Sequence, residues 1–155
     1  MTETLVLPAS LRAQLEQEAM NAFPRECCGL IAGKKDSLML SLSKHEAVAL
    51  HPMPNLARAP DHFEIDPGAH IALLRALRGT EYAVIGCYHS HPNGRAEPSP
   101  RDLAGAGETG FLWLIAALET ATAEPHIACF IWTGSAFAPV RIFPLPQVLG
   151  GEGQG

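Results

Sequence analysis

The stretch AVIGCYHSHPNG at residues 83–94 predicts a buried strand that ends in two closely spaced histidines. Residues 83–88 form an apolar run of strand length, while Pro92 and the Asn-Gly pair behind it are typical of a turn. Because residues i and i+2 of an extended chain project to the same side, His89 and His91 can reach one common point. We therefore expect a core strand that carries two imidazoles to the edge of a sheet.

The residues before this stretch alternate between helix and strand patterns. Leu11, Leu15 and Ala19 form one apolar stripe, which predicts an amphipathic helix over residues 10–24. Residues 52–60 contain three prolines and no periodicity, so they are expected to form a loop. Short apolar or alternating runs predict strands at residues 5–7, 27–33, 37–42 and 47–51.

A second helix is expected between that loop and the histidine stretch, preceded by a short strand at residues 62–65. Asp66 is a suitable cap for this helix, and Ile71, Leu74 and Leu77 would form its apolar stripe. Because strands outnumber helices, at least part of the sheet must be antiparallel, and we expect a mixed α/β fold. The remaining strands are predicted at residues 111–118, 127–132 and 136–143.

The composition is that of a folded domain, since 47% of the 155 residues are hydrophobic and 17% are charged. We expect one domain over residues 1–146 and a flexible, glycine-rich tail over residues 147–155. A net charge of −5 without a basic cluster argues against nucleic acid as a partner. The start of the chain does not resemble a secretion signal, and no apolar stretch is long enough for a bilayer, which predicts a cytoplasmic protein without membrane association. The oligomeric state stays open.

The four cysteines do not form a Cys-x-x-Cys pair, and three of them lie in apolar, strand-like runs. We expect reduced side chains that behave as small hydrophobes rather than a disulfide framework. Adjacent strand residues face opposite sides, so at most one of Cys27 and Cys28 could face the histidines. Whether that cysteine or Cys87 contacts a metal stays open.

The tetrapeptide at residues 99–102, Ser-Pro-Arg-Asp, permits two interpretations. Taken alone it is a capping box, with Ser99 as the cap and Asp102 three residues later. Taken with His89 and His91, the carboxylate of Asp102 completes a His-His-Asp set on a rigid helix start. Three protein ligands leave the fourth tetrahedral position to water, which is the arrangement of catalytic zinc.

The pattern His-x-His-Pro, six residues, then Ser-x-x-Asp resembles the signature of the JAMM (MPN+) metalloproteases, the Mov34/PAD-1 group, in its small prokaryotic single-domain type. Glu26 before an early apolar strand, Asn55 in the middle loop and residues 63–67 also resemble that family, over about residues 24–118. The resemblance implies the cytidine-deaminase-like MPN fold, with a mixed or largely antiparallel central sheet flanked by helices.

The same resemblance implies the roles of the site residues. His89, His91 and Asp102 would bind one Zn²⁺ ion, Glu26 would be the general base, and Ser99 would help to hold the oxyanion. Each role suits the residue type, because zinc activates water near neutral pH, a glutamate can move a proton, and a hydroxyl can donate to an oxyanion. His62 is the one further histidine expected to support the site from outside.

The implied activity is that of a zinc peptidase or isopeptidase acting at the C-terminal tail of a ubiquitin-like or sulfur-carrier protein. The substrate tail is expected to add a strand beside a sheet edge near residues 52–60. Two alternatives stay open: a non-catalytic scaffold related to MPN proteins, and another zinc amide hydrolase.

Overall fold

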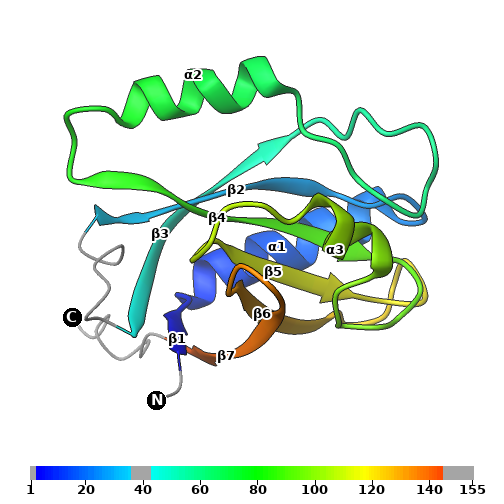
Figure 1. The fold of residues 1–155 in the computed structure, drawn as a ribbon. Coiled ribbons are helices and arrows are strands. Elements are labelled where there is room, and N and C mark those ends of the chain that lie inside the picture. The colour runs from blue at the N-terminus through cyan, green and yellow to red at the C-terminus, as the bar shows by residue number, and fades with distance from the viewer. Residues whose placement is uncertain (1–2, 36–42, 145–155) are drawn as a thin grey trace.

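A single curved sheet dominates the computed structural model, which describes residues 3–35 and 43–144 (Figure 1). Its strands follow the order β1-β3-β2-β4-β5-β6-β7 and close into a barrel. The predicted strand at residues 37–42 and the tail at residues 147–155 lie outside the described residues. The elements are β1 (Glu3–Val6), α1 (Ala9–Ala22), β2 (Cys28–Lys34), β3 (Lys44–Met53), α2 (Pro67–Leu77), β4 (Tyr82–His91), α3 (Pro100–Gly105), β5 (Leu112–Ala117), β6 (His126–Trp132) and β7 (Phe137–Phe143).

The sheet mixes both pairing directions. β1 pairs in parallel with β3 and β7, and β4 pairs in parallel with β5. The other neighbours in the barrel pair antiparallel. The predicted mixed α/β fold with a mixed sheet and flanking helices is therefore confirmed.

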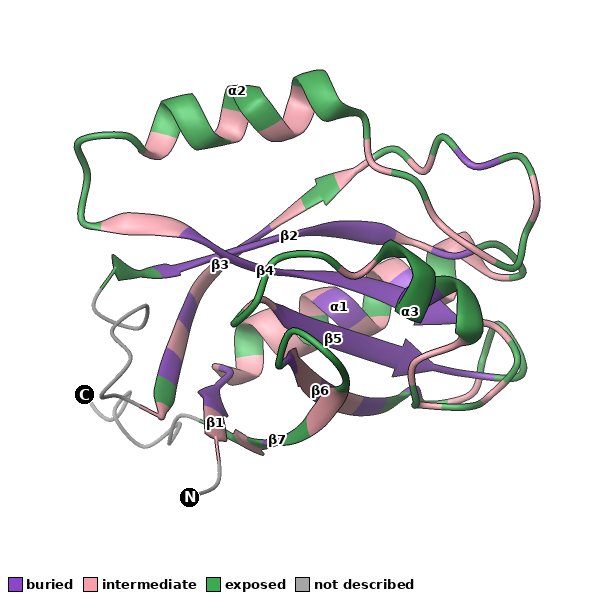
Figure 2. Ribbon diagram, viewed as in Figure 1, coloured by how far each residue is buried: buried purple, intermediate pink, exposed green. Residues whose placement is uncertain are grey.

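The two faces of the sheet carry separate apolar clusters, and the buried residues concentrate in β2, β4 and β5 (Figure 2). Helix α1 packs on one face through Leu15 and Ala19, two residues of the predicted stripe, which are completely buried. The opposite face carries a smaller cluster around Cys87 and Trp113, to which α2 contributes Leu77. This second face is the one on which the histidines of β4 lie.

Close packing of β2 against β4 depends on a glycine. A Cβ atom added at Gly29 would overlap the ring of Tyr88, which is completely buried. The hydroxyl of Tyr88 donates a hydrogen bond to Glu18 Oε1 of α1 at 2.7 Å. These contacts join helix α1 to the two strands that frame the site.

Two local predictions are wrong. Residues 62–66 form no strand, because the Asn55 side chain bonds the carbonyl of His62 and the N–H of Glu64, two backbone groups available to strand pairing. In α2, Ile71 and Leu74 are exposed, whereas the helix packs through Leu73 and Leu77. The cap is as predicted, because Asp66 accepts the N–H of Gly68.

Among the described residues, no helix combines the length and apolarity required to span a membrane.

Candidate metal centre

The two histidines lie at the end of β4, as predicted, and face the same side of the sheet. His89 is opposite Cys28 of β2 and Ile115 of β5, so it is enclosed by strands on both sides and is completely buried. His91 is 3% exposed. The two Nε2 atoms are 2.9 Å apart, which brings both imidazoles to one point.

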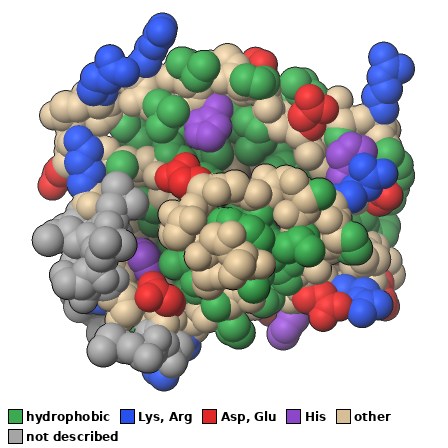
Figure 3. Space-filling view, in the orientation of Figure 1, with side chains coloured by type: hydrophobic (Ala, Val, Ile, Leu, Met, Phe, Trp, Pro, Cys, Tyr) green, Lys and Arg blue, Asp and Glu red, His purple; other side chains and the backbone are tan. Residues whose placement is uncertain are grey.

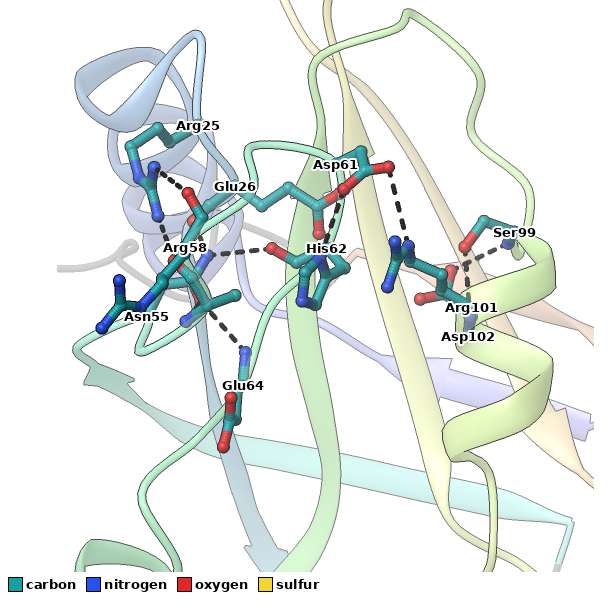
Figure 4. A network of polar contacts seen from close by, with 11 residues as sticks. Arg25, Glu26, Asn55, Arg58, Asp61, His62, Glu64, Ser99, Arg101 and Asp102 are labelled. Carbon is teal, nitrogen blue, oxygen red and sulfur yellow. Dashed lines mark hydrogen bonds and ion pairs between the residues drawn. The ribbon is translucent and has the colours of Figure 1, made fainter.

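Asp102 joins the histidines through the start of α3. Its Oδ2 atom lies 3.2 Å from Nε2 of His89 and 3.1 Å from Nε2 of His91. The same oxygen accepts the backbone N–H of Ser99 at 2.9 Å, and the Ser99 hydroxyl accepts the N–H of Asp102 at 3.1 Å. The capping box is therefore present, and its aspartate also faces the histidines (Figure 4 shows Ser99 and Asp102).

The hydrogen bonds around His91 determine which of its ring atoms faces the site. Its Nδ1 atom lies 2.8 Å from the carbonyl of Arg95, and a carbonyl can only accept, so Nδ1 carries the proton. In the neutral ring, Nε2 then presents a lone pair to the carboxylate of Asp102. Either a hydrogen on Nε2 of His89 or a metal ion would hold these acceptor atoms together.

Two effects shift the pKa values in the site: burial of the side chains, and the contacts of the two histidines with the carboxylate of Asp102. Burial lowers the pKa of His89, against the effect of Asp102. For His91 burial also lowers the pKa, but its hydrogen bonds to Asp102 and to the Arg95 carbonyl outweigh this and raise it. Burial would raise the pKa of Asp102, yet the two histidines hold it well below its usual range. The carboxylate is therefore ionised, as a metal ligand must be.

Glu26, which lies two residues before the start of β2, completes the site. Its side chain is buried, and among the described residues Oε1 has no hydrogen-bond partner. Ligand atoms of Glu26, His89 and His91 all lie within 4.8 Å of one another. Burial raises the pKa of Glu26 to about 8, with His91 lowering it and Asp102 raising it. A cation in the site would favour its ionised form.

The donor set fits a metal ion. Donor atoms bound at about 2.0–2.1 Å to a tetrahedral ion lie roughly 3.3 Å apart. The three separations among His89, His91 and Asp102 are between 2.9 and 3.2 Å. Nitrogen from imidazole and oxygen from carboxylate are both ordinary ligand types for such an ion. Glu26 supplies a second carboxylate beside the histidines, so these four residues could hold a metal ion.

Hollows border this centre on more than one side. A cavity of about 410 Å³ lies between the segment before α2 and helix α3. Asp102 lies at its wall with Phe63, Phe111 and Trp113, and Figure 3 shows hydrophobic side chains gathered on this face below α2. A second hollow of about 270 Å³ is lined by residues that include Glu26, His91, Pro92 and Ser99. Three of the candidate ligands, Glu26, His91 and Asp102, therefore line hollows, whereas His89 is completely buried.

Two contacts at the site were not predicted from the residues. Phe63 stacks on His89 with ring centroids 4.4 Å apart, and Arg95 binds His91 through its carbonyl. In the sequence, Phe63 belongs only to a predicted strand and to a segment that resembles the family. The side chain of His62 bonds Asp61 at 3.2 Å rather than a site residue. Of the two adjacent cysteines, Cys28 is on the histidine face, since it is directly opposite His89.

The match to known sequences covers most of the chain. Residues 8–131 match the family described as prokaryotic homologs of the JAB domain. The chain belongs to this family. The resemblance that His89, His91, Ser99 and Asp102 indicated is thereby confirmed at the level of the family.

The named relatives of this JAB-domain chain include a desampylase, a probable protease and a peptidase. It is 28% identical over 134 residues to a desampylase of Haloferax volcanii, covering 86% of this chain and 88% of the relative. It is 32% identical over 103 residues to a probable TtuB-protein conjugate cleaving protease of Thermus thermophilus, covering 66% and 63%. A CysO-cysteine peptidase of Mycobacterium tuberculosis is 28% identical over 123 residues, with 79% and 76% covered.

A solved structure gives the same fold. The JAB1/MPN domain protein AF2198 of Archaeoglobus fulgidus superimposes with a TM-score of 0.52 over 92% of this chain and 98% of that chain, at 20% identity. At this identity the likeness concerns the fold alone, and it confirms that the JAB-domain chain has the MPN fold.

Proposed function

We propose that this chain is a zinc-dependent peptidase or isopeptidase, formed by one domain over residues 1–146, that cuts at the C-terminal tail of a ubiquitin-like or sulfur-carrier protein. The observation that carries the proposal is the cluster of His89, His91 and Asp102 donor atoms, 2.9–3.2 Å apart, beside the buried carboxylate of Glu26. Two relatives are named for a TtuB-protein conjugate and for CysO-cysteine, which supports a protein-tail substrate.

In this proposal His89, His91 and Asp102 hold a single zinc ion. When bound, zinc supplies Lewis acidity, which polarises a carbonyl and brings the pKa of water to about 7. Glu26 accepts the proton of the attacking water and returns it to the leaving amine. Its burial supports this role, because a carboxyl with a raised pKa retains the basicity that proton transfer near pH 7 requires.

Ser99 would stabilise the developing oxyanion. Its oxygen accepts the N–H of Asp102, which leaves the hydroxyl hydrogen free to donate toward the substrate. The residue is half-buried and lines the smaller hollow with Glu26 and His91. A single donor of this kind is worth about 3 kcal/mol in a transition state.

The cavity between α3 and the segment before α2 suits the substrate tail. This cavity has aromatic walls, and one of the proposed ligands, Asp102, lies at its wall. An apolar side chain that precedes Gly-Gly in the tail would fit there, and the bond after Gly-Gly would then lie at the metal centre. An extended tail could also add a strand near residues 52–60, because β3 pairs with β2 up to Met53 but its pairing with β1 covers only residues 44–46.

We infer a cytoplasmic setting from the cysteines. All four are free, and Cys28, Cys87 and Cys129 are buried. Such thiols persist most readily in a reducing compartment.

The test is cleavage of ubiquitin-like proteins that carry a C-terminal extension beyond Gly-Gly, with zinc present and intact mass as the readout. We expect loss of the extension by the parent protein and none by Glu26→Gln at equal zinc content. A zinc-loaded parent that leaves every such substrate at its original mass would refute the proposed substrate class. Small amide substrates would then be tried next.

A further inference from the structure

Residues 55–64, here called the crossing segment, run past the metal centre from Glu26 to helix α3 (Figure 4). At the Glu26 side the guanidinium of Arg25 donates to the carbonyls of Ala57 and Arg58. At the α3 side Asp61 forms an ion pair with Arg101 at 3.6 Å. The crossing segment is therefore attached to both walls of the site, although it contains no strand or helix.

Asn55 holds the crossing segment through both atoms of its amide. Nδ2 donates to the carbonyl of Glu26 at 3.0 Å and to that of His62 at 3.1 Å. Oδ1 accepts the N–H of Ala57 at 2.9 Å and the N–H of Glu64 at 3.0 Å. These are four hydrogen bonds, the full capacity of an amide side chain. One of them reaches the backbone of the proposed base itself.

The two bonds to His62 and Glu64 enclose Phe63, whose position follows from them. The ring of Phe63 stacks on the imidazole of His89, with centroids 4.4 Å apart and planes inclined by 26°. Trp113 forms a T-shaped contact with the same imidazole, with ring centroids 5.9 Å apart and planes inclined by 88°. His89 is thus enclosed by two aromatic side chains.

The two histidines are oriented by different means. His91 is held by the hydrogen bond from Nδ1 to the Arg95 carbonyl. For Nδ1 of His89, the part of the chain that the structure describes offers no hydrogen-bond partner. A histidine that ligates a metal ordinarily uses its second nitrogen for such a bond, which fixes the plane of the ring. At His89 the aromatic contacts of Phe63 and Trp113 are what remains to fix that plane.

We propose that Asn55 and Phe63 are positioning residues of the metal centre. Asn55 fixes the crossing segment to the backbone of Glu26, and the segment in turn sets the Phe63 ring on His89. Through one side-chain amide, the proposed base and a metal ligand are held in a fixed relation. This inference rests on the proposed function for the identity of the metal and the role of Glu26.

Separate variants test the contribution of the Phe63 ring and that of the Asn55 amide. Phe63→Leu keeps an apolar side chain but removes the stacked ring, whereas Phe63→Tyr keeps the ring. Asn55→Asp keeps an oxygen for the N–H groups of Ala57 and Glu64 and loses both donated bonds. Phe137→Leu is the matched control, because Phe137 contacts Trp113 at 5.3 Å and stands one layer farther from His89.

The experiment measures zinc affinity by chelator competition and the visible absorption of the Co²⁺-substituted protein, which reports ligand geometry. We expect Phe63→Leu to weaken zinc binding about tenfold or more, the usual effect of losing a group that orients a ligand, and to alter the Co²⁺ bands. Phe63→Tyr should restore both, and Phe137→Leu should match the parent. Asn55→Asp should alter the Co²⁺ bands and lower kcat more than it raises KM.

The outcomes separate this inference from the proposed function. Parent zinc affinity and parent Co²⁺ bands in both Phe63→Leu and Asn55→Asp would overturn it, as would an equal loss in Phe137→Leu. Should circular dichroism show that Phe63→Leu does not fold, Asn55→Asp decides. A parent that binds zinc but cleaves no ubiquitin-like substrate refutes the proposed function, and the affinities still decide the inference. A parent that binds neither metal overturns both.

Discussion

Replacing Glu26 by glutamine should stabilise the metal-free protein at neutral pH, even though this residue is the proposed base. The carboxyl is 5% exposed and its Oε1 atom has no partner among the described residues. Burial raises its pKa from 4.5 to about 8. A glutamine has nearly the shape of the protonated acid and cannot ionise, so it avoids the cost of burying a charge.

The magnitude follows from the two pKa values. Below pH 4.5 both the folded and the unfolded chain keep the proton, so Glu26 has no unfavourable effect there. As the pH rises toward 8 the unfolded chain ionises first, and stability falls by about 1.4 kcal/mol for each pH unit. The cost is therefore about 3 kcal/mol at pH 7 and about 5 kcal/mol above pH 8.

Urea unfolding in excess chelator at pH 5, 7 and 8.5 tests this reasoning. Glu26→Gln should exceed the parent in free energy of unfolding by under about 1 kcal/mol at pH 5 and by about 3 kcal/mol at pH 7. Glu124→Gln, at an exposed position, is the control and should show no such trend. A difference between parent and Glu26→Gln that does not change with pH would refute the reasoning.

Three further outcomes are expected. Asp102→Asn should lose most of its zinc affinity, measured by chelator competition. Glu26→Gln should retain one zinc ion and lose turnover by about 10²-fold or more. Loss of zinc in Glu26→Gln but not in Asp102→Asn would make Glu26 the ligand. His89→Ala should contain no stoichiometric zinc by elemental analysis, and a full complement would contradict its place in the ligand set. Gly29→Ala should lower the free energy of unfolding in urea by about 1–3 kcal/mol, because the new methyl group overlaps Tyr88; unchanged stability would mean that the ring moves freely.

The central part of the site could be predicted because its information is local. The period of two along a strand places His89 and His91 on one side, and the structure has them there. Ser99 and Asp102 were readable as a helix start, and that start lies against the histidines. Glu26 lies far from them in sequence, and only the family resemblance identified it.

Other features of the site and fold depend on contacts between residues that no periodic sequence pattern connects. Phe63 and His89 are brought together by a connection without regular structure, so no spacing rule links them. The mispredicted strand at residues 62–65 has the same origin, since alternation is visible in the sequence but the capture of its backbone by Asn55 is not. Helix α2 has more apolar residues than one face of a helix can bury. The sequence pattern therefore did not show that Leu73 packs on the sheet with Leu77.

The closure of the barrel has a consequence for biosynthesis. β1, near the amino terminus, takes its partner on one side from β7, which ends at Phe143. During translation the first strand is made more than a hundred residues before this neighbour exists, so the barrel cannot close until β7 has been synthesised. A chain cut before β7 would deprive both β1 and β6 of a neighbour at once. Incomplete chains would therefore expose two strand edges with unpaired backbone groups, which can pair with other chains. Rapid degradation of such fragments would protect the cell from their aggregation.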